Sequence, residues 1–256
     1  MGLSDVLKTA SELVLPKKHT TAVILAAGSG ERFSAGSVGA SEKKQFVSVL
    51  GRPVLLRTAE AFEKCELISE IIVVSSSDEM EHCRELLENK ISKLRCVIAG
   101  GDTRQKSAMA AIEAVDPKTD YIAIHDAARC LITPKQIADT VRAAYRNGAA
   151  AAAERAVDTV KYATADECIE STIDRDHVWL VKTPQVFKAN IYRVAAYSAF
   201  KDGVTVTDDC MAAERVGFKV KLVDCGHENI KLTYAVDRII AEAILRCREA
   251  ESGGDK

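Results

Sequence analysis

Short apolar runs alternate with segments of helical periodicity along the first half of the chain, and this alternation restricts the fold more than any other feature. The expected strands are 21–27, 70–76, 94–100 and 121–127, and the expected helices are 54–65, 78–89, 104–115 and 133–148. The last helix has start and stop signals, with Thr133 as N-cap, Pro134 in the first turn and Gly148 after the end. Strands separated by helices form βαβ units. The sequence therefore predicts an α/β fold with a mainly parallel sheet flanked by helices.

The pattern changes after this half of the chain. Residues 149–187 have β-branched side chains and polar turns without the helix–strand alternation, which indicates an inserted β-arm at about 155–178. Two more helices and a strand at 218–225 are expected to close the fold. At the other end, apolar residues at helical spacing predict a short amphipathic helix within 1–20. We therefore expect an N-terminal helical extension at 1–20 and a single domain at 21–250.

Composition excludes several classes of protein. Of 256 residues, 47% are hydrophobic and 28% are charged, which is typical of a globular chain rather than a disordered one. The net charge of −2 gives no general attraction to nucleic acid or to an acidic membrane, and no apolar stretch predicts a membrane span. The eight cysteines form no C-x-x-C pair and no zinc spacing. They are expected to be reduced thiols, as in a cytoplasmic protein.

The stretch "AVILAAGSGERF" (22–33) ends an expected strand in a glycine-bearing turn. It lacks the third glycine of G-x-G-x-x-G, where Phe33 stands, and it lacks the Walker lysine. The cations Arg32, Lys43 and Lys44 follow the turn. Backbone N–H groups and cations together suit a triphosphate, so we favour a phosphate loop. The alternative is a plain tight turn beside a solvated basic loop.

Three further stretches carry candidate chemistry. In "IAIHDAARC", Asp126 ends an expected strand and Arg129 follows, so the carboxylate could hold a divalent metal or form an ion pair with the arginine. In "GGDTRQKSA" (100–108), the backbone could contact a base with Ser107 nearby, or Asp102 could simply cap a helix. Lys231 in "HENIKLT" (227–233) is uninformative by itself. Because parallel strands bind ligands beyond their carboxyl ends, the glycine turn and the Asp126–Arg129 segment are expected to share one cleft.

Taken in order, these segments resemble one family closely. "AVILAAGSGERF", "KKQF", "GGDTRQKSA", "HDAAR", "AVDTVK", "TIDR", "TPQVF", "TVTDD" and "NIKLT" resemble the 2-C-methyl-D-erythritol 4-phosphate cytidylyltransferases of non-mevalonate isoprenoid synthesis, from about Thr21 to about Glu242. The resemblance implies a Rossmann-like nucleotidyltransferase with a protruding β-arm for dimerisation. It implies a reaction of CTP with methylerythritol phosphate that gives CDP-methylerythritol and pyrophosphate, with Mg²⁺.

The resemblance also implies a role for each matching residue. It assigns CTP binding to Ala26, Ala27, Gly28, Gly101, Asp102, Ser107 and Ala127. It assigns catalysis to Arg32, Lys44, Asp126 and Lys231, with Asp126 also positioning Mg²⁺. It assigns contacts to methylerythritol phosphate to Arg129, Thr183 and Lys231, and to Thr159 and Arg175 from the arm of a partner subunit. The expected assembly is therefore a homodimer.

The chain departs from the family pattern in four places. Lys43 and Cys130 stand where proline is usual, Val157 stands where a basic residue is common, and the loop 34–42 is longer than typical. Because "AVDT" also resembles the sister enzymes that use ribitol 5-phosphate, that substrate is the alternative. "HDAAR" and "TIDR" favour methylerythritol phosphate.

Two other classes are disfavoured. An NAD-dependent oxidoreductase would need the third glycine and an acidic residue at the end of the second strand, where only Asp78 is nearby. A nucleotide sensor without catalysis would not need the complete set of charged residues that the resemblance assigns to the reaction.

Overall fold

The computed structural model describes residues 18–28, 33 and 43–253 of the chain. The loop 34–42 and residues 1–17 of the expected N-terminal extension lie outside these residues, and of the described residues 18–20 Thr20 begins the first strand. Arg32 also lies outside them.

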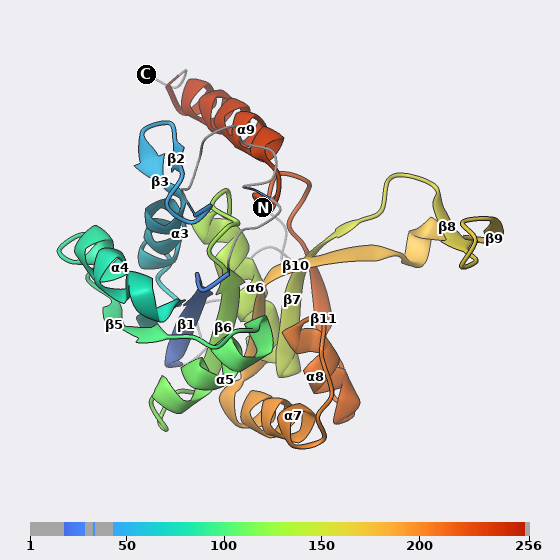
Figure 1. The fold of residues 1–256 in the computed structure, drawn as a ribbon, viewed down its shortest axis with the longest axis horizontal. Helices are drawn as coiled ribbons and strands as arrows, with labels where there is room; N and C mark the ends of the chain where they lie inside the picture. The colour runs from blue at the N-terminus through green and yellow to red at the C-terminus, as the bar shows by residue number, and fades with distance from the viewer. Residues whose placement is uncertain (1–17, 29–32, 34–42, 254–256) are drawn as a thin grey trace, which may run out of the picture.

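A seven-stranded sheet forms the centre of the described molecule (Figure 1). Its strands, in spatial order, are β11 (Lys221–Asp224), β7 (Ala149–Arg155), β10 (Trp179–Lys188), β6 (Tyr121–Asp126), β1 (Thr20–Leu25), β4 (Glu70–Ser75) and β5 (Leu94–Ala99). The strands β6, β1, β4 and β5 run parallel, as do β7 and β11. Only β10 is antiparallel to its neighbours β6 and β7. The expected mainly parallel sheet is therefore confirmed.

Helices cover both faces of this sheet (Figure 1). They are α3 (Val54–Glu63), α4 (Met80–Leu87), α5 (Arg104–Ala114), α6 (Pro134–Asn147), α7 (Ala189–Lys201), α8 (Asp209–Arg215) and α9 (Ala235–Gly253), with the 3₁₀ turns η1 (Ser77–Glu79) and η2 (Arg175–His177). A small hairpin joins β2 (Ser48–Val49) to β3 (Arg52–Pro53). The expected start and stop of α6 are confirmed, because Thr133 and Gln136 form a capping box and Gly148 follows at φ +84°.

The end of the chain differs from the expectation. In the described part of the chain, three helices rather than two follow β10, namely α7, α8 and α9. The shortest of the three is α8, which begins after its N-cap Asp208 and covers two turns. Its periodicity is too brief to stand out from the surrounding loop.

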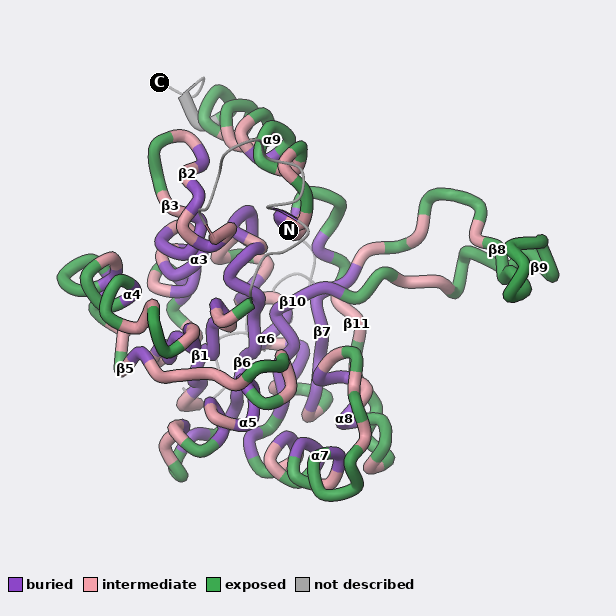
Figure 2. The backbone as a smooth tube through the Cα atoms, viewed as in Figure 1, coloured by how far each residue is buried: buried purple, intermediate pink, exposed green. Residues whose placement is uncertain are grey.

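The core lies on both faces of the sheet (Figure 2). Along β4, Ile71 and Val73 pack with α3, α4 and α6, whereas Ile72 and Val74 pack with α5, α7 and α8. Strands buried on both faces need apolar side chains at every position. This explains why the sequence shows continuous apolar runs rather than alternation.

Residues between β7 and β10 project from the body as an arm (Figure 1). The arm contains a separate hairpin of β8 (Val160–Ala163) and β9 (Ile169–Ile173), and residues 161–177 are all exposed. At its base, β7 pairs with β10 through Arg155 and Trp179, whose guanidinium and ring lie 4.4 Å apart. Among the described helices, none is both long enough and apolar enough to cross a bilayer.

Candidate active site

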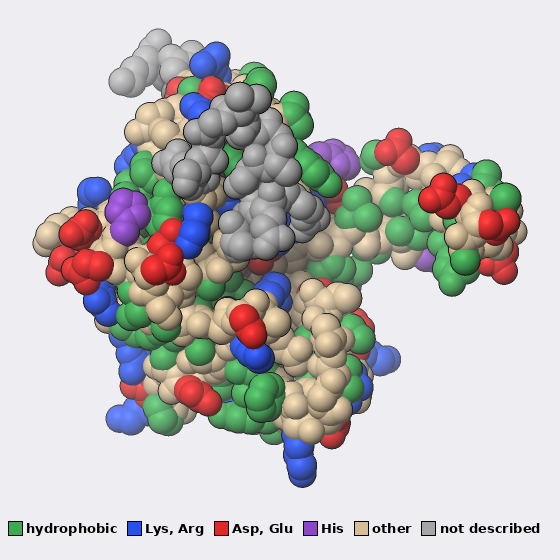
Figure 3. All heavy atoms as spheres, viewed as in Figure 1, with side chains coloured by type: hydrophobic (Ala, Val, Ile, Leu, Met, Phe, Trp, Pro, Cys, Tyr) green, Lys and Arg blue, Asp and Glu red, His purple; other side chains and the backbone are tan. Residues whose placement is uncertain are grey.

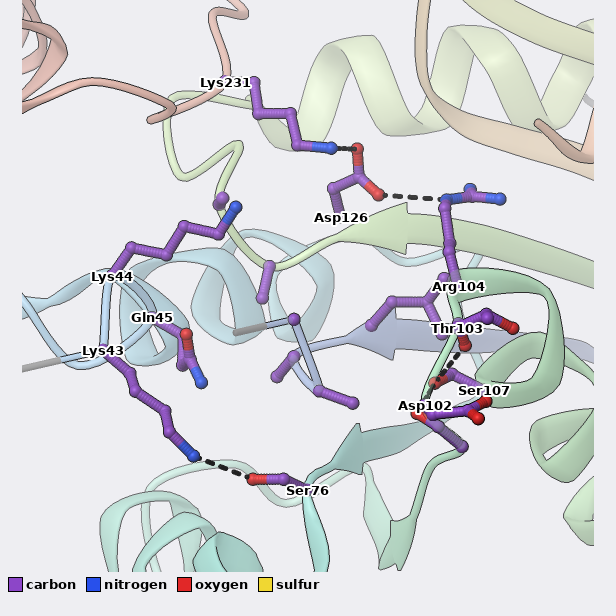
Figure 4. A pocket seen from close by; sticks show the side chains of 17 residues that line it. Lys43, Lys44, Gln45, Ser76, Asp102, Thr103, Arg104, Ser107, Asp126 and Lys231 are labelled. Atoms are coloured by element: carbon purple, nitrogen blue, oxygen red, sulfur yellow. Dashed lines mark hydrogen bonds and ion pairs between the residues drawn. The ribbon is translucent and has the colours of Figure 1, made fainter. Parts of the chain in front are cut away.

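A cavity of about 560 Å³ opens at the carboxyl ends of the parallel strands (Figure 4). Among the residues expected at the site, it is lined by Ala26, Ala27, Gly28, Lys44, Gly101, Asp102, Ser107, Asp126, Ala127 and Lys231. These ten residues come from the carboxyl end of β6, from the segments that follow β1, β5 and β6, from α5, and from two more distant segments. The structure thus brings the glycine turn and the Asp126 segment into one cleft, as the strand order requires.

The two glycine-bearing turns differ in what their glycines do. A Cβ on Gly100 would lie 2.6 Å from Ser107 Oγ, 2.9 Å from Val74 Cγ1 and 3.0 Å from Ala27 Cβ, so close packing requires glycine there. A Cβ on Gly28 would meet no described atom within 4 Å. Packing therefore does not explain Gly28, which leaves its backbone open to the cavity.

The two adjacent lysines point in different directions (Figure 4). Lys43 Nζ lies 2.9 Å from Glu79 and 3.3 Å from Asp78, and it donates to Ser76 Oγ. The hydrogen bond with Glu79 raises the pKa of Lys43, against the opposing effect of burial. Lys44 instead extends into the cavity, towards the side on which Asp126 and Lys231 lie. Lys43, at the position where the resemblance implies proline, therefore anchors its loop to Ser76 and η1, and it leaves Lys44 extended into the cavity.

Asp126 is the acidic centre of the cavity. Its Oδ2 accepts a hydrogen bond of 2.9 Å from Lys231 Nζ and lies 3.5 Å from Arg129 Nε, and its Oδ1 lies 3.5 Å from Arg104 Nε. Burial alone would raise the pKa of this carboxyl, but the charges of Lys231, Arg104 and Arg129 outweigh burial and hold the pKa well below its ordinary value. Asp126 is consequently ionised at neutral pH.

A hydrogen-bonded chain fixes the backbone beneath Asp126. The Asp126 N–H donates to Thr183 Oγ1 at 3.1 Å, and Thr183 Oγ1 lies 3.0 Å from His125 Nδ1. His125 Nε2 lies 3.3 Å from the Arg129 carbonyl oxygen, which can only accept. This assigns the proton to Nε2 and makes Nδ1 the acceptor of the threonine hydroxyl. Burial lowers the pKa of His125 to about 3, so the ring is neutral.

Arg129 and Thr183 belong to this supporting layer rather than to the cavity lining. Arg129 Nη1 donates to the Asn229 carbonyl at 3.0 Å, and Asn229 Nδ2 donates to the Thr183 carbonyl at 2.9 Å. The first bond attaches the loop that carries Lys231 to the segment after β6, and the second attaches it to β10. The geometry therefore explains how a lysine far along the chain reaches Asp126.

The turn after β5 corrects one alternative of the sequence analysis. Thr103, not Asp102, caps α5, since its side chain accepts the Lys106 N–H at 3.1 Å. Asp102 pairs with Lys106 at 2.8 Å and lines the cavity. Ser107 is buried within hydrogen-bond distance of the carbonyls of Gly101 (3.2 Å) and Thr103 (2.9 Å). Thr103 itself has the extended backbone of an N-cap, which places its hydroxyl over the first free N–H groups of α5.

Several residues that line the cavity are not among those expected from the sequence, namely Leu25, Gln45, Ser76, Thr103, Arg104 and Ala128. Arg104 is the most informative of them, because it contacts Asp126. One signal pointed to it. Arg104 is the first residue of α5, and a cation at a helix N-terminus is unfavourable with the helix dipole. Such a residue needs a carboxylate partner nearby.

The arm residues lie elsewhere. Thr159 and Arg175 are exposed and do not line the cavity of their own chain. Arg175 donates to the Val157 carbonyl at 2.7 Å, so the side chain of Val157 takes no part in that bond. Of the other departures, Cys130 is buried in the cluster beneath α9, and burial raises its pKa to about 11.

Comparison with known proteins identifies the relatives of this chain. The family model described as IspD, 2-C-methyl-D-erythritol 4-phosphate cytidylyltransferase, matches residues 20–247. A protein of that name from Caldanaerobacter subterraneus is 40% identical to this chain, and the match covers 89% of this chain and 99% of the relative. A protein of the same name from Syntrophus aciditrophicus is 37% identical, and the match covers 91% of this chain and 98% of the relative.

Solved structures agree with these relatives. The 4-diphosphocytidyl-2C-methyl-D-erythritol synthase of Anaerococcus prevotii has a TM-score of 0.79 at 30% identity, covering 90% of this chain and 100% of its own. The 2-C-methyl-D-erythritol 4-phosphate cytidylyltransferase of Thermus thermophilus has a TM-score of 0.72 at 27% identity, covering 89% and 99%.

The mainly parallel sheet with a charged cavity at its carboxyl edge, shared with these enzymes, defines a nucleotidyltransferase. More specifically, the chain belongs to the 2-C-methyl-D-erythritol 4-phosphate cytidylyltransferase family.

Proposed function

We propose that this protein joins CTP to 2-C-methyl-D-erythritol 4-phosphate and releases pyrophosphate. The observation that carries the proposal is the arrangement around Asp126, where an ionised carboxylate lies among Lys231, Arg104 and Arg129 in the cavity that Lys44 enters. Such a site suits two phosphate-bearing anions. The family match then selects which anions these are.

The nucleotide occupies the cavity between the two glycine-bearing turns. Gly28 and its neighbours Ala26 and Ala27 offer backbone to the triphosphate, together with Lys44 and Arg32. Gly101, Asp102, Ser107 and Ala127 form another part of the wall, which suits the ribose and the base. The open space at Gly28 supports this orientation, because phosphate oxygens need close approach to backbone N–H groups.

The reaction needs no covalent enzyme intermediate. A phosphate oxygen of methylerythritol phosphate attacks the α-phosphorus of CTP, a new P–O bond forms, and the bond to the β-phosphate breaks with pyrophosphate taking the electron pair. Both reactants are anions at neutral pH, so the task of the protein is to position them and to neutralise charge. Lys44 and Arg32 act on the triphosphate, and Lys231 acts on the second substrate. Arg129 and Thr183, which lie behind the cavity wall, hold Lys231 and Asp126 in position for that substrate.

The residues of the cavity fit a magnesium ion that arrives with the nucleotide. No group of three or more His, Cys, Asp or Glu side chains is placed to hold a metal in residues 18–28, 33 and 43–253, so a cage built from protein alone is absent there. Mg²⁺ keeps several waters and takes one or two carboxylates plus substrate phosphates. Asp126 would be the residue that holds it. When bound, the ion neutralises phosphate charge.

The arm supports a homodimer. Its exposed apolar residues include Val157, Tyr162, Ile169, Ile173, Leu180 and Val181. Figure 3 shows hydrophobic side chains along the arm and acidic ones at its tip. A second copy that covers these residues would bring Thr159 and Arg175 to the neighbouring cavity.

All eight cysteines are free, which agrees with reaction in the cytoplasm.

The test is pyrophosphate release from CTP and Mg²⁺, with methylerythritol phosphate and ribitol 5-phosphate in parallel. We expect a strong preference for methylerythritol phosphate, because the relatives that this chain matches over nearly their whole length are named for that substrate. A preference for ribitol 5-phosphate would move the chain to the sister group. If neither substrate led to pyrophosphate release, the proposal would be overturned.

A further inference from the structure

The "TVTDD" segment contains a buried carboxylate that the reaction just described does not use. Asp209 is the first residue of α8, and its side chain is only 5% exposed. Its Oδ2 lies 2.6 Å from Arg104 Nη2, and its Oδ1 accepts a hydrogen bond from the buried Tyr192 hydroxyl. Asp209 does not line the cavity, so it can act on the cavity only through Arg104.

Arg104 is held between two carboxylates. Its terminal Nη2 contacts Asp209 closely, whereas its Nε lies at the longer distance of 3.5 Å from Asp126 Oδ1. Burial alone would lower the pKa of Arg104, but the two aspartates more than compensate and raise it. The stronger contact therefore lies on the side away from the cavity, and it draws the guanidinium away from Asp126.

The position of Asp209 is itself fixed by several bonds. Gln185 Oε1 accepts the N–H groups of Asp209 (3.0 Å) and Cys210 (3.2 Å), so β10 anchors the start of α8. The Tyr192 ring stacks on Phe187, with ring centroids 5.1 Å apart. A carboxylate held this firmly is a fixed reference point for the arginine that it binds.

We infer that Asp209 is a positioning residue that holds Arg104 back from Asp126 and so keeps Asp126 Oδ1 accessible to the ligands of the cavity. Without the Asp209 charge, Arg104 keeps one carboxylate partner and closes on Asp126. A tight Arg104–Asp126 pair then occupies the oxygen that a ligand or its cation needs. This inference rests on the proposed function only for the identity of the ligand. The arrangement of Asp209, Arg104 and Asp126 does not depend on that function.

The adjacent aspartate provides a matched control. Asp208 caps α8 by accepting the Met211 N–H at 2.9 Å, and it accepts Gln185 Nε2 at 2.9 Å. Asp208→Asn changes the same charge in the same segment without touching Arg104, and asparagine caps a helix as well as aspartate does. A third variant, Tyr192→Phe, removes only one hydrogen bond to Asp209.

The experiment measures CTP binding by calorimetry with and without Mg²⁺, alongside the ¹⁵Nε resonance of Arg104, assigned with Arg104→Lys. Asp209→Asn is expected to shift the resonance and to weaken Mg²⁺-dependent CTP binding by about tenfold or more, while Asp209→Glu restores part of it. Asp208→Asn is expected to leave the resonance in place and to change binding by less than about twofold, and Tyr192→Phe to fall between the two.

An unchanged Arg104 resonance in Asp209→Asn would overturn the inference, as would equal losses in the Asp208 and Asp209 variants. The Arg104 resonance is recorded on the protein without substrate. A wild-type protein that fails to turn over CTP would therefore refute the proposed function, while the resonance would still test the role of Asp209.

Discussion

Lys231 Nζ lies 2.9 Å from Asp126 Oδ2, although 105 residues separate the two in the sequence. The contact joins the end of β6 to the loop before α9, and the bonds of Arg129 and Asn229 hold that loop in place. Three cations therefore surround the ionised Asp126, and one of them, Arg104, also pairs with Asp209. The local excess of positive charge is what a site for two phosphate esters requires.

Lys231→Met tests this excess of charge. Removing one cation that stabilises the transition state is expected to cost about 3 kcal/mol of activation free energy, or about two orders of magnitude in rate. Pyrophosphate release under saturating CTP measures the effect. Lys221→Met, at an exposed lysine of β11, is the control and should keep the wild-type rate. Equal rates in the two variants would remove Lys231 from the reaction.

Two glycine variants separate packing from binding. Gly100→Ala places a methyl group 2.6 Å from Ser107 Oγ and 2.9 Å from Val74, so we expect a loss of stability of about 1–3 kcal/mol. Gly28→Ala meets no described atom within 4 Å, so it should unfold at the wild-type denaturant concentration and yet bind CTP more weakly. Urea unfolding and CTP titration distinguish them. Normal CTP affinity in Gly28→Ala would mean that phosphate does not approach this turn.

The neutral His125 predicts a pH dependence of stability. Its pKa is about 3 in the folded protein and about 6.5 when unfolded. Only the unfolded state binds the proton between these values, so the stability is complete above pH about 6.5 and falls as the pH drops towards 3. Asp126, whose pKa is also lowered, adds a dependence in the same direction at lower pH, because its stabilisation is present above pH about 4 and is lost only below it.

Urea unfolding at pH 6, 5 and 4 measures this dependence. His125→Gln is expected to remove a slope of about 1.4 kcal/mol per pH unit from the wild-type curve. His177→Gln, at an exposed histidine of η2, is the control and should retain the slope. Parallel curves for wild type and His125→Gln would show that the ring is not held neutral.

The sheet could be predicted because burial of a strand on both faces produces a pattern among neighbouring residues in the sequence. Each parallel strand needs several apolar residues in succession, and β1, β4 and β6 all have them. The capping box of α6 is equally local, since Thr133 and Gln136 are three residues apart. Short elements such as α8 have a weaker local pattern, and the sequence predicts two helices after β10 where the structure has three.

The site could be predicted only in part, because its long-range contacts have no local record. Strand order placed Gly28 and Asp126 together. Nothing in the sequence near Lys231 indicated that it reaches Asp126, and only the family resemblance supplied that role. Arg104 was missed since its partners, Asp126 and Asp209, are 22 and 105 residues away.

The arm makes the final prediction, which concerns assembly. Ile169 is 68% exposed at the end of the arm, which is a poor position for an isoleucine unless another surface covers it. If the arms associate, Ile169→Asp should convert a dimer to a monomer, because a buried unpaired carboxylate is costly. Sedimentation velocity measures the change. Ile239→Asp is the matched control, since Ile239 is 69% exposed on α9, away from the arm. The partner arm is expected to supply Thr159 and Arg175 to the cavity, so activity should fall with the dimer. A monomeric wild type, or an Ile169→Asp variant that remains a dimer, would contradict assembly through the arm. Thr159 and Arg175 would then have no role at the cavity of a partner subunit.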